Sequence, residues 1–468
     1  MQRTQIKQLY KNTPEYEGKN ITVAGWVKTI RLSKTFGFIE LNDGSFFKNL
    51  QIIFSEENLP NYEDIQKTKV GSALVVQGDV VATPTNAQPF EIKATSIFVE
   101  GQSEDDFPLQ KKRHSLEFLR EIAYLRPRTN LFRAVFKIRS EAAYAFHKYF
   151  NEHNFVYVNT PIITGSDAEG AGEMFKLTTL DLKNIPLTKE NEVDYKEDFF
   201  AKETNLTVSG QLNVEAFAQA FSNVYTFGPT FRAENSNTSR HAAEFWMIEP
   251  EMAFVDLKEN IKRAEDMLKY VISHLLKECK EEMEFLNKFV EKGLLEKLAK
   301  LLNSEFKTIT YTDAIRLLEK EIQLKNVKFE YPLKWGLDIK SEHERYLTEK
   351  IFDGPVTIID YPKNIKAFYM RMNEDNETVA AMDMLVPGIG ELIGGSQREE
   401  RLEKIEDRIK EMSLNKQDYW WYLNLRRYGS TTHSGYGIGF DRFLMYVTGV
   451  SNIRDVQPYP RTAKNADY

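Results

Sequence analysis

Short apolar runs with alternating polar positions fill residues 20 to 100. Turn-forming stretches such as Asn42-Asp43-Gly44 and Thr83-Pro84-Thr85-Asn86 separate them. A period of two between turns predicts β-strands, and several short strands in so few residues favour a small closed barrel. The five predicted strands are "NITVAGWVKTI", "TFGFIELND", "LQIIF", "ALVVQGDVVAT" and "FEIKATSIFVE".

The apolar spacing becomes helical after Asn130, where "NLFRAVFKIRSEAAYAFHKYF" predicts a long amphipathic helix over 130–150. The following "FVYVNTPIIT" predicts a strand that ends at Pro161. A second helical block covers 256–303, and the spacing of Asp256 and Glu259 predicts a capping box at its start.

Strand-like runs return in "VTIIDYP", "KAFYMRMN" and "TVAAMDMLVPG" without regular alternation with helices. This order counts against a doubly wound parallel sheet and favours an α+β fold with an antiparallel sheet flanked by helices. The predicted domains are an OB-type β-barrel over residues 1–105, a hinge over 106–129, and a second domain over 130–468 that contains the helical block 256–303.

The composition is that of an ordinary globular protein, with 42% hydrophobic and 28% charged residues in 468. No apolar run is long enough to span a membrane, and the N-terminus lacks the apolar core of a signal peptide. We therefore expect no membrane association and a cytoplasmic location. The single cysteine, Cys279, excludes an internal disulfide and a zinc site with several thiolates.

The formal charge of -7 hides a basic zone between Lys111 and Arg139. In that zone nine basic residues against two acidic ones leave +7. A charge run of this kind is most often a solvated helix face, and contact with a nucleic acid is the alternative.

The common phosphate-binding motifs are missing. The pair Gly18-Lys19 is followed by Asn20, so there is no Walker loop. The glycines of "HSGYGIGFDRF" lack the spacing of a dinucleotide fold, and neither HExxH nor GxSxG occurs. If the chain binds a nucleotide, arginines must hold its phosphates.

Three stretches together resemble the signature motifs of class II aminoacyl-tRNA synthetases. The helix from Asn130 into "FVYVNTPIIT" resembles the first motif, "FRAENSNTSRHAAEF" the second and "GYGIGFDRF" the third. With an N-terminal barrel, the set resembles the subgroup for aspartate, asparagine and lysine. The resemblance implies a class II catalytic domain, ATP as a substrate, Mg²⁺ as a cofactor, a tRNA partner and a homodimer formed through the first motif.

The resemblance also implies roles for single residues. Arg232 is expected to be catalytic, bridging the substrate carboxylate and the α-phosphate, because a guanidinium grips both kinds of oxygen bidentately. Glu234 is expected to accept from the adenine amino group, with Phe245 and Arg442 on opposite faces of the base. The full expected ATP site is Arg232, Glu234, Arg240, His241, Phe245, Glu391, Gly439 and Arg442.

At the triphosphate end, Arg240 and His241 are expected to reach the β and γ phosphates. Glu391, and second to it Asp383, are the expected magnesium ligands, since Mg²⁺ takes oxygen ligands and bridges phosphates. Many relatives carry a serine three residues after this glutamate, where this chain has Gly394, so that side-chain contact is missing.

The resemblance favours asparagine over aspartate as the amino acid. Where aspartate enzymes carry a lysine that pairs with the substrate side chain, this chain has Val214, followed by Glu215. An anion there should repel aspartate and accept the amide hydrogens of L-asparagine. Glu215 could instead be a surface residue of a helix. The full expected amino-acid site is Glu169, Ser209, Gln211, Glu215 and Arg398, with Arg398 donating to the side-chain oxygen.

The barrel is expected to read the anticodon of tRNA(Asn). Phe38 would stack on the middle base, Gln51 would bond to its edge and Arg31 would lie nearby. Phe36 and Phe38 share one face of their strand by alternation, so both could instead point into the barrel.

Three functions stay open beside the attachment of asparagine to tRNA that the resemblance implies. They are an aspartate–tRNA ligase, which could also charge both tRNAs, an ammonia-dependent asparagine synthetase on the same catalytic fold, and a noncatalytic RNA-binding paralogue. Val214 and Glu215 argue against the first, the barrel against the second, and the intact Arg232, Glu391 and Arg442 against the third.

Overall fold

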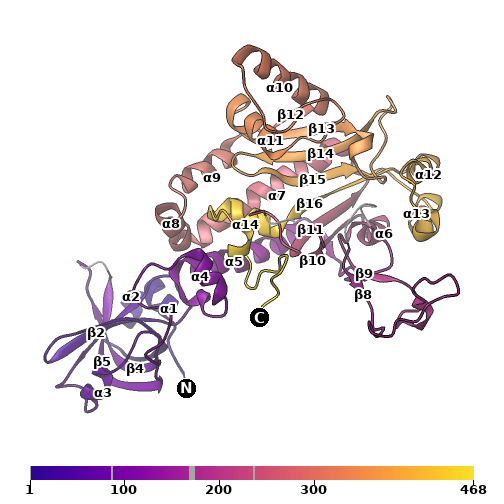
Figure 1. Cartoon of the computed structure of the whole chain (residues 1–468). Coiled ribbons are helices and arrows are strands. Elements are labelled where there is room, and N and C mark those ends of the chain that lie inside the picture. The colour runs from indigo at the N-terminus through magenta and orange to yellow at the C-terminus, as the bar shows by residue number, and fades with distance from the viewer. Residues whose placement is uncertain (1, 86–87, 168–173, 236–237) are drawn as a thin grey trace. The chain divides into compact units, whose positions relative to one another are not determined.

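The computed structural model describes residues 2–85, 88–167, 174–235 and 238–468. The chain forms two compact units, Met1–Phe136 and Lys137–Tyr468 (Figure 1). Among the described residues, no helix combines the length and the apolar character that crossing a membrane requires.

The first unit is built on a closed five-stranded barrel with the strand order β1-β2-β3-β5-β4. β3 and β5 run parallel, and the other neighbours are antiparallel. The predicted barrel is therefore confirmed. Its strands are β1 (Asn20–Leu32), β2 (Phe36–Asn42), β3 (Leu50–Ser55), β4 (Ala73–Ala82) and β5 (Phe90–Gly101). The helices of the first unit are α1 (Ile6–Lys11), α2 (Thr13–Tyr16), α3 (Tyr62–Gln66), α4 (Leu116–Glu121) and η1 (Arg126–Arg128).

Alternation along β2 sets the two faces of the barrel wall. Ile39 and Leu41 are fully buried, whereas Phe36 lies outside with 41% of its surface exposed. Gly37 faces inward, where a Cβ would come within 2.4 Å of the Phe54 ring. Glycine at this position therefore leaves room for a large core aromatic.

The second unit contains an eight-stranded sheet with the order β12-β13-β14-β15-β16-β11-β10-β6. Its central pairs are antiparallel, and only the edge pairs β12–β13 and β10–β6 are parallel. This confirms the predicted antiparallel sheet. Its strands are β6 (Val156–Tyr157), β10 (Asn223–Phe231), β11 (Glu244–Ala253), β12 (Lys307–Thr310), β13 (Val356–Pro362), β14 (Thr378–Val386), β15 (Gly390–Gln397) and β16 (His433–Gly439). A small sheet has the order β7-β9-β8, from Ile163–Thr164, Thr204–Leu206 and Lys176–Leu177.

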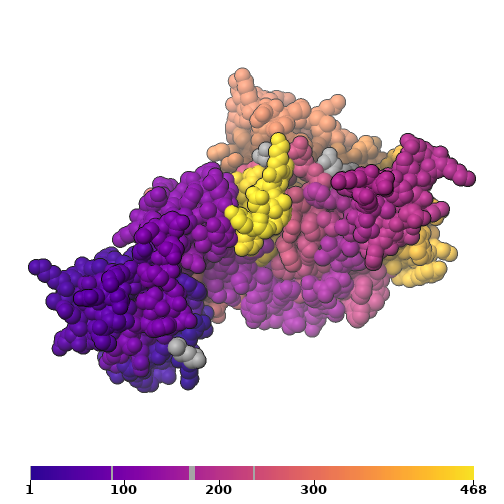
Figure 2. All heavy atoms as spheres, turned by 60° about the horizontal axis from the view of Figure 1, so that its bottom comes forward, coloured from indigo at the N-terminus to yellow at the C-terminus, as the bar shows by residue number. Residues whose placement is uncertain are grey.

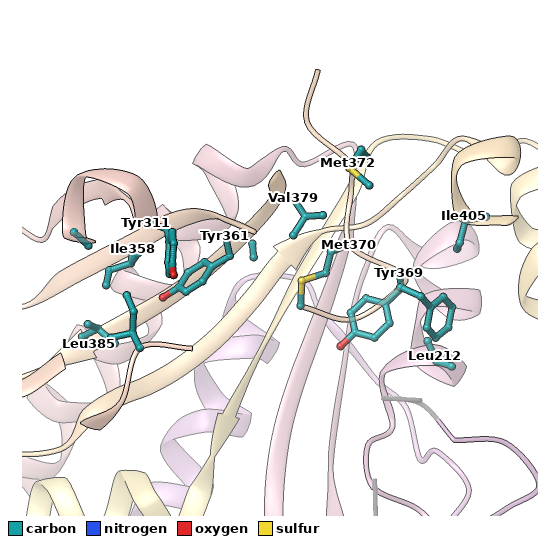
Figure 3. Close-up of a cluster of buried hydrophobic side chains, with 14 of the residues drawn as sticks. Leu212, Tyr311, Ile358, Tyr361, Tyr369, Met370, Met372, Val379, Leu385 and Ile405 are labelled. Atoms are coloured by element: carbon teal, nitrogen blue, oxygen red, sulfur yellow. The ribbon is translucent and has the colours of Figure 1, made fainter. Parts of the chain in front are cut away.

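Helices cover the large sheet. α7 packs on β14, β15 and β16, α6 on β10 and β11, and α10 on β13. Tyr311 of α10 and Tyr361 of β13 lie in one buried apolar cluster, with ring centroids 5.2 Å apart (Figure 3). The long helices are α5 (Asn130–Glu152), α6 (Gln211–Phe221), α7 (Leu257–Glu278), α8 (Lys280–Phe289), α9 (Leu294–Asn303) and α10 (Tyr311–Lys325). Later helices are α11 (Ser341–Tyr346), η3 (Leu347–Ile351), α12 (Leu402–Glu411), α13 (Trp420–Arg427) and α14 (Phe440–Thr448).

Three local predictions differ from the structure. The strand predicted to end at Pro161 is split into β6 and β7, which belong to different sheets. The run 366–373 is not a strand: it forms only isolated bridges from Met370 and Met372, because its apolar side chains are buried in the core without a continuous ladder.

The predicted capping box is also incomplete. Asp256 caps α7 by accepting from the Glu259 amide at 2.9 Å. The Glu259 carboxylate instead accepts from Arg263, so the return bond of a capping box is absent.

Candidate active site

The β10–β11 hairpin carries the charges of the second motif. The last pair of its ladder joins Phe231 to Glu244. Arg232 and Glu234 follow directly after β10, and Arg240 and His241 precede β11. The charged side chains thus leave the sheet where the ladder ends, rather than lying in the apolar core below it.

A cavity of about 290 Å³ lies at this end of the hairpin, and we call it the arginine cavity. α14 adds Arg442 and β15 adds Glu391 to its wall. All eight residues expected around ATP line it. The complete lining is Arg232, Glu234, Arg240, His241, Ala242, Ala243, Phe245, Met247, Glu391, Leu392, Gly437, Gly439, Asp441, Arg442, Ile453, Thr462 and Ala463.

The C-terminal segment closes one side of the arginine cavity. The Ala243 amide donates to the Arg461 carbonyl at 2.7 Å, and Thr462 and Ala463 reach the lining. Figure 2 shows this segment in yellow on the surface. Thr462 and Ala463 are small and neutral, so no chemical signal in the sequence marked them.

The cavity wall concentrates positive charge. Burial lowers the pKa of Arg240, and the neighbouring charges of Arg442 and Arg345 lower it further. Burial likewise lowers the pKa of His241, with additional contributions from Arg442 and Arg232. Positive groups that repel one another in this way are stabilised when a polyanion binds between them. The triphosphate of a nucleotide is such a polyanion.

Arginine and aromatic planes lie close together in the cavity. The Arg232 guanidinium carbon is 5.5 Å from the Phe245 ring centroid. Arg442 donates through Nη1 to the Glu391 carbonyl at 3.2 Å, and Arg240 donates through Nη1 to the Ile389 carbonyl at 2.9 Å. Two guanidinium groups thus bind backbone carbonyls of the β14–β15 hairpin. This arrangement places them near the carboxylates of Asp383 and Glu391, which belong to the same hairpin.

The expected magnesium ligands converge on the strand pair β14–β15. A Cβ on Gly394 would lie 2.9 Å from Glu391 Oε1 and 3.5 Å from Asp383 Oδ1, so the missing side chain leaves space between these oxygens. Lys366 donates to Asp383 Oδ2 at 2.7 Å. Desolvation and then the Asp383 charge raise the pKa of Glu391. A divalent cation would relieve this repulsion.

Within the described ranges, no group of three His, Cys, Asp or Glu side chains could hold a metal by itself. This does not exclude magnesium, which commonly binds one or two carboxylates together with waters and phosphates of the substrate. The residues present therefore fit an ion brought in with a nucleotide rather than an all-protein cage.

Glu344 of α11 was missed by the sequence prediction. It accepts from the Glu391 amide at 3.1 Å, and a Cβ on Gly390 would collide with its carboxylate. Burial, followed by the Glu391 charge, raises the pKa of Glu344 to about 8. Since 47 residues separate the two glutamates, only the fold brings them together.

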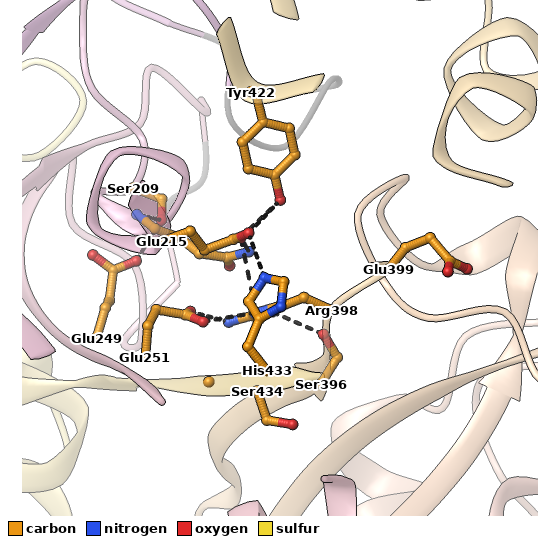
Figure 4. Close-up of polar contacts among 12 residues, drawn as sticks. Ser209, Glu215, Glu249, Glu251, Ser396, Arg398, Glu399, Tyr422, His433 and Ser434 are labelled. Atoms are coloured by element: carbon orange, nitrogen blue, oxygen red, sulfur yellow. Dashed lines mark hydrogen bonds and ion pairs between the residues drawn. The ribbon is translucent and has the colours of Figure 1, made fainter. Parts of the chain in front are cut away.

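A second polar site, the Glu215 cluster, is formed by residues on or next to α6, β11, α13, β15 and β16 (Figure 4). Glu215 is fully buried, so its alternative placement on the surface is wrong. Its carboxylate accepts from Tyr422 at 2.7 and 2.8 Å, from Arg426 at 2.9 Å and from His433 at 3.1 Å. Gln211 donates to it at 3.1 Å.

Cations of the protein compensate the charge of Glu215. Burial raises the pKa of Glu215, but the charges of Arg426, His433 and Arg398 together hold it below its ordinary value. These neighbours favour the ionised form of Glu215.

The second carboxylate of the cluster belongs to Glu251. Arg398 binds it through Nε at 3.1 Å and through Nη2, and donates from Nη1 to Ser396 at 2.8 Å. Burial, which outweighs Arg398, raises the pKa of Glu251 to about 7.

Ser209, another residue of the expected amino-acid site, donates to Glu249, which also accepts from the Gly210 amide at 3.0 Å. Burial raises the pKa of Glu249. Glu169 lies outside the described residues. The buried Glu249 was missed because nothing local in "FWMIEPEM" distinguishes it from its neighbours.

Two parts of the chain match models of known families. Residues 115–463 match a family described as tRNA synthetases class II (D, K and N). The chain belongs to this class II synthetase family. Residues 21–100 of the synthetase match the OB-fold nucleic acid binding domain of the anticodon-binding type. The family and the fold class predicted from the sequence are thereby confirmed.

Full-length relatives include the asparagine–tRNA ligases of Acetivibrio thermocellus, at 63% identity, and Alkaliphilus metalliredigens, at 60%, each covering 100% of both chains. Among solved structures, asparaginyl-tRNA synthetase from Pyrococcus horikoshii, complexed with asparaginyl-adenylate, has a TM-score of 0.86 at 31% identity. That match covers 100% of this chain and 99% of the other. Aspartyl tRNA synthetase from Entamoeba histolytica, at 23% identity and a TM-score of 0.78, shows the shared fold alone.

The barrel of this synthetase has a hollow of about 180 Å³, the barrel hollow, that brings the three expected anticodon residues together. Its lining is Thr29, Arg31, Phe38, Glu40 and Gln51. Phe38 and Phe36 both lie on the outer face, with ring centroids 5.6 Å apart, so the inward alternative is wrong. Gln51 donates to Glu91 at 2.7 Å, and this bond holds its amide at the edge of the hollow.

Part of the basic zone of the synthetase is structural. Arg126 is fully buried, 4.4 Å from the Phe132 ring centroid. Arg133 donates to the Phe46 and Phe47 carbonyls at 2.9 Å. Arg139 pairs with Asp441 at 2.6 Å. The charge of +7 therefore overstates what this zone offers to a nucleic acid.

Proposed function

We propose that this synthetase is an asparagine–tRNA ligase, which activates L-asparagine with ATP and transfers it to the 3′ end of tRNA(Asn). The observation that carries the proposal is the arginine cavity, in which guanidinium groups from the second and third motifs converge on one space. The full-length similarity to asparagine–tRNA ligases at 60 to 63% identity supports the same activity.

Activation requires the asparagine carboxylate to attack the α-phosphate of ATP and displace pyrophosphate, so two anions must approach each other. Arg232 neutralises both and holds them in line, which lowers the barrier through positioning and electrostatics. Glu234 accepts from the adenine amino group, while Phe245 and Arg442 enclose the base. Arg240 exchanges its bond to the Ile389 carbonyl for the outer phosphates, where His241 joins it.

Glu391 and Asp383 would hold Mg²⁺ with the phosphates. When bound, the ion neutralises charge that develops on the phosphate oxygens. Glu391 would be the principal ligand, because Lys366 already engages one oxygen of Asp383.

Asparagine selection rests on the Glu215 cluster. Arg398 donates to the side-chain oxygen of the substrate, and ionised Glu215 accepts from its amide. Ser209, Gln211 and Glu169 serve the ammonium and backbone side. Aspartate would place a third carboxylate beside Glu215 and Glu251, which disfavours its binding.

The proposal includes a homodimer formed through α5 and β6, which correspond to the first motif. It also includes a cytoplasmic location, where a translation enzyme meets its tRNA.

One pair of assays tests the proposed function. ATP–pyrophosphate exchange with asparagine, followed by charging of tRNA(Asn), is the expected result. Exchange with aspartate alone would instead assign an aspartate–tRNA ligase. Exchange with neither amino acid would favour a noncatalytic RNA-binding role.

For the anticodon contact, we expect Phe38→Ala to raise the KM for tRNA(Asn) by about 5- to 100-fold, since one base stack contributes ~1 to 3 kcal/mol. Amino-acid activation should not change, because it needs no tRNA. Aminoacylation at varied tRNA concentration measures the effect. Phe98→Ala is the matched control, because Phe98 is 62% exposed on β5 and does not line the barrel hollow.

A further inference from the structure

Arg426 is the closest cation to the buried Glu215 carboxylate. Its Nη2 lies 2.9 Å from Glu215 Oε2, whereas Arg398 Nε lies 4.0 Å from Oε1. Both Arg426 and Glu215 have fully buried side chains. Burial reduces solvent screening of this pair, and Arg426 is the strongest single charge that acts on Glu215.

The orientation of Arg426 is fixed by two further contacts. Its Nε donates to the Glu399 carbonyl at 2.9 Å, and its guanidinium carbon lies 4.1 Å from the Tyr422 ring centroid. Tyr422 in turn donates to Glu215. Two residues of α13 therefore hold the carboxylate of a residue that belongs to α6.

This arrangement is costly if stability is its purpose. Arg426 Nη1 has no hydrogen-bond partner within the described part of the chain. Buried ion pairs can often be replaced by apolar packing without loss of stability, so the pair itself is weak evidence for a structural role. A role in setting the charge and position of Glu215 accounts for it better.

We propose that Arg426 is a specificity-determining positioning residue, which keeps Glu215 charged and in place so that Arg398 is left for the substrate. The proposal rests on the proposed asparagine ligation and adds a residue to its selectivity. Arg398, Arg426 and His433 face the carboxylates of Glu215 and Glu251. Asparagine brings a neutral side chain into this site, whereas aspartate brings a further carboxylate.

Loss of the charge at position 426 would act on Glu215 in one of two ways. Glu215 would either take up a proton or draw Arg398 away from Glu251 and from the substrate. In the first case the side-chain amide of asparagine faces a neutral acceptor instead of a carboxylate, and in the second its side-chain oxygen loses the Arg398 donor. Discrimination falls because recognition of asparagine weakens.

The test is ATP–pyrophosphate exchange on the full-length protein with Arg426→Met, which keeps the bulk and removes the charge. We expect the KM for asparagine to rise by about 10- to 100-fold, as for a lost hydrogen bond to a charged group. The KM for ATP should change less than about threefold, and exchange with aspartate should not increase. Arg426→Lys should recover most of the loss. Arg427→Met, on the exposed face of α13, is the matched control.

A double-mutant comparison separates positioning from folding. Because Arg426 acts through Glu215, Arg426→Met in a Glu215→Gln background should change the KM for asparagine by less than about threefold. An effect in that background as large as in the wild type overturns the proposal. If Arg426→Met does not fold, Arg426→Lys decides: equal rises in the KM values for asparagine and ATP would contradict the proposal.

The two failures are distinguishable. If the wild-type protein does not activate asparagine, the proposed function fails first. If the wild type activates asparagine and Arg426→Met has an unchanged KM for it, only the inference about Arg426 fails.

Discussion

Arg232→Gln is expected to reduce ATP–pyrophosphate exchange by about 10²- to 10³-fold, the cost of removing one aligned donor from a developing charge. Glutamine retains polarity and length but neither the charge nor the fork that grips a carboxylate and a phosphate together. The loss should appear mainly in kcat, because Arg232 acts most strongly when the two anions approach each other. Steady-state exchange at varied ATP and asparagine measures it.

The matched control for this prediction is Arg316→Gln on α10, where the arginine side chain is 73% exposed and pairs with the neighbouring Asp313. It should leave exchange unchanged. A loss of less than about threefold in Arg232→Gln would mean that the arginine cavity does not carry the chemistry. Equal losses in both variants would point to a general electrostatic effect.

The barrel was predictable because its signals are local. Alternation and turn residues decide each strand, and the predicted runs agree with β1 to β5 within a few residues. The run 366–373 shows the limit of such local signals. The apolar residues of this run correctly predict that Phe368 and Met370 are buried. They do not show whether a neighbouring strand is available to form a hydrogen-bonded ladder.

The arginine cavity was predictable for a different reason. The charged loop beside a hairpin pattern, together with "GYGIGFDRF", resembles family motifs whose residues meet around ATP. Spacing alone gives no reason to join Arg232 to Arg442, which lie more than 200 residues apart. The pairing came from the resemblance, and the fold gives it a physical basis in the neighbouring strands β11 and β16.

The partners of the recognised residues could not be read from the sequence. Glu215 meets Arg426 across 211 positions and His433 across 218. No periodicity marks such a contact, and each residue alone is most often solvent-exposed. The sequence predicted an anion at Glu215 but not that Arg426 and His433 contact it. These cations change how the site separates asparagine from aspartate. The side chain of aspartate interacts with the net charge of the whole cluster rather than with Glu215 alone.

Glu391→Gln is expected to reduce exchange by about 10²-fold or more at physiological magnesium, with partial recovery as the magnesium concentration rises. The amide is nearly isosteric but binds a hard divalent cation poorly, so the ion loses its principal protein ligand. Because Asp383 shares an oxygen with Lys366, it can replace Glu391 only in part. Calorimetric binding of ATP over a magnesium series gives a readout independent of turnover. The control is Glu319→Gln on the exposed face of α10. If Glu391→Gln binds ATP with the wild-type dependence on magnesium, the carboxylate does not hold the ion, and the space beside Gly394 has another purpose.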